Sequence, residues 1–142
     1  MSKSDAFETA LVGLIFNGNA IAGLATNHTT TPITNLYCSL HTADPGETGS
    51  QTTNETSYTN YTRASVARNS GGWTVTANVV TPVSTISFPA CGGGSATITH
   101  FGVGSTSTGA GVLYYSGTVS PNIAVSSGVT PQLTTSTTIS ED

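Results

Sequence analysis

The sequence predicts a mainly β fold: a single-domain antiparallel β-sandwich, jelly-roll-like, with one short N-terminal helix. Short runs rich in Val, Ile and Thr alternate with turns of Gly, Pro and Ser over most of the chain, which is the pattern of sandwiches and small barrels. Helical periodicity is confined to the first residues. At 142 residues the chain has the length of one domain, residues 1–142.

Residues 4–16 predict an amphipathic helix. Ser4 or Asp5 can cap its free amides, and Gly18 is a natural stop. Its apolar residues fall at i, i+3, i+4, i+7 and i+8 on one stripe: Phe7, Ala10, Leu11, Leu14 and Ile15. Two interpretations are open. The stripe packs on the neighbouring sheet, or the helix docks a neighbouring subunit through Phe7, Leu11, Leu14 and Ile15.

Residues 36–46 predict an opening strand followed by a sharp turn. Apolar and polar side chains alternate from Leu36 to His41, as in a strand with one face in a core. Pro45 fixes φ and Gly46 permits a positive φ, so both end the strand. We expect His41, Asp44, Pro45 and Gly46 to form a structural turn. In it, Asp44 is an Asx-type acceptor and His41 bonds the backbone of its own turn.

Residues 46–60 form a long polar segment with almost no apolar anchor. A loop of this length is usually functional or disordered, and we expect it to be exposed. Strand-like runs follow at residues 61–68, 73–79, 83–88, 96–103, 112–115, 119–125 and 132–139.

The charge pattern excludes several classes of partner. The formal net charge is -4, and Lys3, Arg63 and Arg68 are the fixed cations. Nucleic acids and anionic membranes attract clustered cations, so we expect neither as a partner. Asp5 and Glu8 interrupt the first apolar patch, so no signal peptide is expected.

The motifs of common catalytic and metal sites are missing from the sequence. Cys-x-x-Cys, His-Glu-x-x-His and Gly-x-Ser-x-Gly do not occur. Asp44, Glu47 and Glu55 fall in a turn and a loop, where solvation is the default. Cys38 and Cys91 do not make a disulfide framework, and we expect two reduced, buried thiols. We therefore expect no enzymatic activity, no cofactor and no metal.

The order of motifs resembles a family of small virion proteins of tailed bacteriophages, described as tail-fibre-like or minor structural proteins. The most specific segment is His41-Thr42-Ala43-Asp44-Pro45, which is preceded by a leucine-containing strand and followed by a Gly-containing loop. Tyr61-Thr62-Arg63 stands where the family's Tyr-Ala-Arg is expected, and Trp73 comes after two glycines.

This resemblance implies a structural protein of the virion, similar to the β-sandwich cement proteins that decorate phage heads. On that interpretation the chain is made in the bacterial cytoplasm and lies on the capsid surface, where a dimer bridges subunits of the major capsid protein. The alternative is a tail or tail-fibre component that contacts the host surface, with residues 46–60 as the candidate receptor-binding loop.

Overall fold

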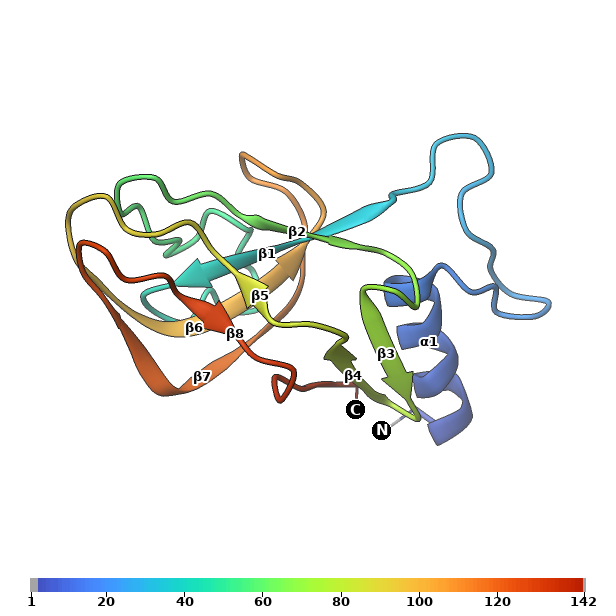
Figure 1. Ribbon diagram of the computed structural model, residues 1–142. Helices are drawn as coiled ribbons and strands as arrows, with labels where there is room; N and C mark the ends of the chain where they lie inside the picture. The colour runs from blue at the N-terminus through green and yellow to red at the C-terminus, as the bar shows by residue number, and fades with distance from the viewer. Residues whose placement is uncertain (1–2, 142) are drawn as a thin grey trace. The chain divides into compact units, whose positions relative to one another are not determined.

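The computed structural model describes residues 3–141 and is mainly β, with one helix and several antiparallel sheets (Figure 1). The predicted fold class is confirmed, and the sheets are consistent with a β-sandwich-like fold; the jelly-roll strand order stays a prediction. The chain divides into two compact units, described separately below, and the single domain also stays a prediction. Within residues 3–141, no helix has the length and apolarity needed to cross a membrane.

The first unit comprises residues 3–35, 67–85 and 133–141 of the described chain. Its helix α1 (Asp5–Asn17) lies beside the hairpin of β3 (Trp73–Thr76) and β4 (Val79–Pro82), as Figure 1 shows. Strand β9 (Ile139–Ser140) pairs with β4 and completes a three-stranded antiparallel sheet.

The buried face of α1 is not the predicted stripe. Val12 and Phe16 are fully buried, and the Phe16 ring meets Trp73 edge-on with 4.9 Å between ring centroids. Phe7 is 37% exposed, and Leu11, Leu14 and Ile15 are half-buried. The fully buried side chains thus lie outside the predicted stripe, because apolar residues cover most of the helix circumference. Packing of the stripe on the sheet and docking of a neighbouring subunit both stay predictions.

The ends of α1 follow local chemistry. Gly18 adopts the left-handed conformation (φ 69°) and its amide bonds the Leu14 carbonyl, as expected for a glycine stop. Arg68, from outside the helix, donates to the carbonyls of Leu14 and Ile15. This places a cation where the helix dipole favours one. At the other end Ser4 is the cap residue, but its side chain makes no capping hydrogen bond.

The predicted strand at residues 73–79 is two strands joined by a tight turn. Ala77 has φ 52°, and the chain reverses there so that Thr76 pairs with Val79. A non-glycine residue with positive φ gives no sequence signal of a turn, which is why the run appeared continuous.

The second unit comprises residues 36–66 and 86–132. Its four-stranded sheet has the order β2 (Ala64–Ala67), β1 (Asn35–His41), β6 (Ala96–Gly104), β7 (Leu113–Val125). Strands β5 (Ile86–Ser87) and β8 (Gln132–Leu133) form a short separate pair. The predicted runs at 112–115 and 119–125 are one strand, and the closing run 132–139 is two short ones.

Strand β1 is the centre of the second unit. It pairs antiparallel with β6, with Cys38 opposite Val103 and Leu40 opposite Phe101. Ser39, Leu40 and His41 are all 0% exposed, so both faces of its last residues are covered. The expectation of one core-facing and one solvent-facing side was therefore wrong here.

Candidate functional site

The turn after β1 holds its residues by local hydrogen bonds. Asp44 Oδ1 accepts from the Gly46 amide at 2.9 Å, which is the expected Asx-type contact. Gly46 has φ 70°, a value that glycine adopts without strain. Pro45 is buried and Asp44 is exposed. Asp44 therefore shapes the turn, and no metal or substrate is needed to explain it.

His41 bonds the long loop and not its own turn, which corrects the prediction. Its Nδ1 lies 2.8 Å from the Thr53 carbonyl, and its Nε2 lies 2.8 Å from Ser39 Oγ. A carbonyl can only accept, so Nδ1 carries the proton and Nε2 accepts from the serine hydroxyl. Burial lowers the pKa of His41 and favours this neutral ring.

The Ser39–His41 contact has the spacing of a nucleophile and its general base. Both residues are 0% exposed, so a substrate has no access to the serine oxygen. The third partner is the Thr53 carbonyl, whereas a triad uses a carboxylate in that place. The pair therefore links β1 to the loop through buried hydrogen bonds.

The loop at residues 46–60 is less exposed than its composition predicts. Gln51 is 0% exposed, and Thr56 and Tyr58 are 5% and 6% exposed. The Gln51 side chain accepts from the Thr106 amide at 3.0 Å and donates to the Tyr37 carbonyl at 3.4 Å. A Cβ at Gly104 or Gly111 would overlap this side chain. A side chain at either position would therefore displace the buried Gln51 amide.

An ion pair ties the loop to the start of β2. Arg63 Nε and Nη2 donate to the two carboxylate oxygens of Glu55, each at 2.7 Å. The guanidinium also donates to the carbonyls of Thr106 and Gly109 at 3.0 and 2.9 Å. The side chains are 3% and 14% exposed. The expectation that Glu55 is simply solvated was wrong.

Tyr61 joins the same network. Its hydroxyl donates to Glu55 Oε1 at 2.9 Å and accepts from the Leu40 amide at 3.0 Å. Burial raises the pKa of Tyr61, so the phenol remains a donor. Tyr61 also stacks near Phe88, with centroids 6.3 Å apart, and meets Tyr58 edge-on at 5.3 Å. The network thus spans the loop, β1 and the segment after β5.

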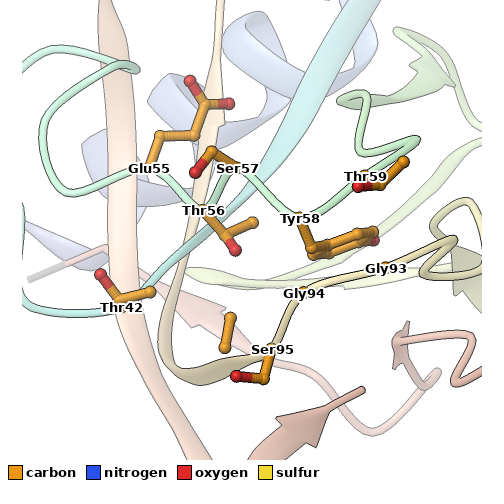
Figure 2. Close-up of a pocket in the computed structure, with 10 residues that line it drawn as sticks. Thr42, Glu55, Thr56, Ser57, Tyr58, Thr59, Gly93, Gly94 and Ser95 are labelled. Carbon is orange, nitrogen blue, oxygen red and sulfur yellow. The ribbon is translucent and has the colours of Figure 1, made fainter. Parts of the chain in front are cut away.

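A groove with a volume of about 380 Å³ lies beside this network, and Glu55 belongs to both. Figure 2 shows the residues that line it, which come from the end of β1, the loop and the glycine turn before β6: Thr42, Glu55, Thr56, Ser57, Tyr58, Thr59, Gly93, Gly94, Ser95 and Ala96. Burial raises the pKa of Tyr58 to about 12, and its hydroxyl donates to the Pro89 carbonyl at 3.0 Å. The groove wall is therefore uncharged at Tyr58.

The hydroxyl of Thr56 is the unusual feature of this wall. Its Oγ1 is buried and has no hydrogen-bond partner in the structure, and Figure 2 shows it turned toward the space between Thr42 and Ser95. A buried polar group without a partner costs about 1–3 kcal/mol.

A second hollow of about 350 Å³ lies beside the turn. Asp44, Glu47 and His100 line it together with Ser116, Gly117 and Thr118. No group of three or more His, Cys, Asp or Glu side chains that could hold a metal ion occurs among residues 3–141.

The two cysteines are free and buried. Burial raises the pKa of Cys38 to about 12, so this thiol stays protonated and unreactive at neutral pH. Neither cysteine lines the groove.

Of the predicted site residues, the structure brings His41, Asp44, Pro45 and Gly46 together in the second unit, whereas Phe7, Leu11, Leu14 and Ile15 belong to the first. The residues that sequence reasoning missed are Gln51, Thr56 and the pairing of Glu55 with Arg63. The Tyr-x-Arg motif was the one available signal, because an arginine in a chain with so few cations needs a partner.

Comparison with known proteins agrees with the resemblance. None of the curated proteins matches the chain. A family model described as "Podophage GP4 fiber I protein gp80" matches residues 2–140, which is nearly the whole sequence. The protein is accordingly a bacteriophage structural protein of the virion. The chain belongs to the podophage GP4 fiber I protein gp80 family.

Proposed function

We propose that the chain is a fibre component of a podophage virion, exposed at the tail and contacting the host surface. The observation that carries this proposal is the match of the fibre family over residues 2–140. It favours the tail-fibre alternative over the capsid cement protein. The role is structural and non-enzymatic, and no cofactor enters it.

The geometry of the second unit supports a contact role. Buried groups hold the loop at residues 46–60 from beneath: Gln51 by its amide and Glu55 through Arg63. Between these anchors Thr52 and Asn54 are exposed. A loop fixed in this way loses little conformational entropy when it meets a partner.

The competing assignment is a capsid decoration protein that binds the major capsid protein as a dimer. The two assignments differ in copy number and place. We expect a small number of copies per virion, counted by quantitative mass spectrometry against the major capsid protein, and immunogold label at the tail. Hundreds of copies and label over the head would contradict the fibre assignment and support the decoration protein.

The oligomeric state gives a second measurement. Light scattering of the purified chain reports its mass. A capsid-bridging protein of the kind considered above is a dimer, so a monomeric mass would count against that assignment. The control is Phe7→Ser, because Phe7 is the large apolar side chain of α1 that is exposed. If the parent chain is a dimer and the Phe7→Ser variant is a monomer, the helix stripe forms the contact between the two copies.

A further inference from the structure

Two loops of the second unit meet through buried polar side chains. One is the loop at residues 46–60, and the other is the β6–β7 loop at residues 105–112, between the strands labelled β6 and β7 in Figure 1. Thr52 and Asn54 are exposed in the first loop, and residues 106–110 are exposed in the second. Exposed loops have few buried contacts, so each usually opens by itself. Buried hydrogen bonds between these two loops change that expectation.

Gln51 bonds both ends of the β6–β7 loop. Its backbone amide donates to the Gly111 carbonyl at 3.1 Å, and its side-chain Oε1 accepts from the Thr106 amide at 3.0 Å. Gln51 is 0% exposed, so water does not compete for these bonds in the folded chain. Movement of the β6–β7 loop away from Gln51 therefore breaks hydrogen bonds of both loops at once.

Arg63 makes the second link, because its guanidinium bonds residues of both loops. Toward the β6–β7 loop, Nη1 and Nη2 donate to the carbonyls of Thr106 and Gly109 at 3.0 and 2.9 Å. Toward the loop at residues 46–60, Nε and Nη2 donate to the two carboxylate oxygens of Glu55, each at 2.7 Å. The Arg63 side chain is 3% exposed, and a buried charge is costly to leave without partners. If either loop opens, the same guanidinium loses partners.

We propose that residues 46–60 and residues 105–112 open as one cooperative unit, and that Arg63 and Gln51 couple them as positioning residues. A perturbation of either loop then reaches the other. The exposed residues of both loops belong to one surface of constant shape, made of Thr52, Asn54, residues 106–110 and Val112. The contact proposed for the fibre accordingly extends to the β6–β7 loop. This extension rests on the proposed function, whereas the coupling of the loops does not.

Amide hydrogen exchange of the full-length chain, followed by two-dimensional NMR, tests the coupling. Arg63→Met should speed exchange by about tenfold, and by a similar factor in each loop, because both loops lose hydrogen bonds to a charged group. Phe16→Ala is the control, since it removes a buried ring from the first unit and should leave local opening of the two loops unchanged. The probes are hydrogen-bonded amides, Gln51 and Thr56 in one loop and Thr106 and Gly111 in the other.

A milder pair of variants decides the question if Arg63→Met does not fold. Ala110→Gly adds backbone freedom at an exposed position of the β6–β7 loop, and it should speed exchange about threefold at the probes of both loops. Ala124→Gly makes the same change at an exposed position of β7 outside both loops, and it should leave the probes unchanged.

The extended contact is tested by competition between the purified full-length chain and the phage for adsorption to its host cells. Three variants place a lysine at exposed threonines of the second unit: Thr52→Lys, Thr108→Lys and Thr130→Lys. The first two should weaken the competition by a similar factor of about tenfold, because both positions belong to the coupled surface. Thr130→Lys lies outside both loops and should compete as the parent does.

The coupling is overturned if Arg63→Met or Ala110→Gly speeds exchange in one loop only, or if Phe16→Ala speeds it in both loops as much as Arg63→Met does. Competition that Thr52→Lys weakens and Thr108→Lys leaves intact would remove the β6–β7 loop from the contact, and the fibre function would stand. If the parent chain does not compete, the host contact itself is contradicted, while the exchange measurement still decides whether the loops are coupled.

Discussion

The Glu55–Arg63 pair gives the sharpest test of how the second unit is held together. Arg63→Met keeps a long side chain but removes the guanidinium. The variant leaves the Glu55 carboxylate without its partner and the carbonyls of Thr106 and Gly109 without their donors. Breaking one side of a buried ion pair costs about 3–5 kcal/mol. A domain of this size has about 5–15 kcal/mol in total, so the loss should be large and measurable.

The assay is urea denaturation followed by tyrosine fluorescence and near-ultraviolet circular dichroism. The double variant Glu55→Leu with Arg63→Met removes both charges, so no lone buried charge remains. It should recover part of the stability, with a coupling free energy of about 2 kcal/mol between the two sites. Recovery is incomplete because Tyr61 loses its acceptor.

The matched control is Lys3→Met, which removes a cation that pairs with Glu141 at 3.1 Å and has 33% side-chain exposure. A pair this exposed contributes about 0–1 kcal/mol. The reasoning would be refuted if Arg63→Met costs less than about 1 kcal/mol, or if the two single substitutions simply add. Either result would mean that water solvates the pair in solution.

Three other predictions concern the core, the buried histidine and the helix surface. Phe16→Ala should lower the free energy of unfolding by about 3–5 kcal/mol in thermal or urea unfolding, because a fully buried ring that contacts Trp73 is lost. If the chain is a single domain, one unfolding transition shifts. Two separate transitions would contradict the single-domain prediction. Because burial lowers the pKa of His41, the unfolded chain takes up the proton first as the pH falls, so stability is full above about pH 6.5 and decreases below it. His41→Gln should flatten this slope below about pH 6.5, and an unchanged slope in urea unfolding would show that other groups cause it. Phe7→Glu should leave stability within about 0.5 kcal/mol, since the side chain is 37% exposed, and a larger loss measured by denaturation would place Phe7 in the core.

Local signals predicted the parts of the fold that local chemistry controls. The alternation of short apolar runs and turns predicted a mainly β chain, and Gly18 ended the helix where expected. The Asp44–Gly46 turn followed from side chains two residues apart. In each case the physical cause lies within a few residues, so it is visible in the sequence.

The features that the sequence did not predict depend on contacts between residues far apart in the chain. Gln51 is buried through contacts with Tyr37 and Thr106, 14 and 55 positions away. A polar composition therefore predicted exposure. The helix has apolar residues on most sides, so only the position of Trp73 decides that Phe16 faces inward. The unpaired hydroxyl of Thr56 could not be predicted from the sequence, because it depends on which groups surround the side chain in the folded chain.

The buried amide of Gln51 has an evolutionary consequence. Because Gln51 and its flanking glycines, Gly104 and Gly111, hold the loop from inside, the outward-facing positions carry little of the folding free energy. Substitutions at the exposed Thr52 can therefore accumulate at a cost within about 0.5 kcal/mol, as at ordinary surface sites. Asn54 is less free to change, because its φ is 56° and its Nδ2 donates to the Asp44 carbonyl at 2.8 Å. If the loop contacts the host surface, as proposed above, single mutations at such positions alter the contact while the scaffold beneath it stays the same.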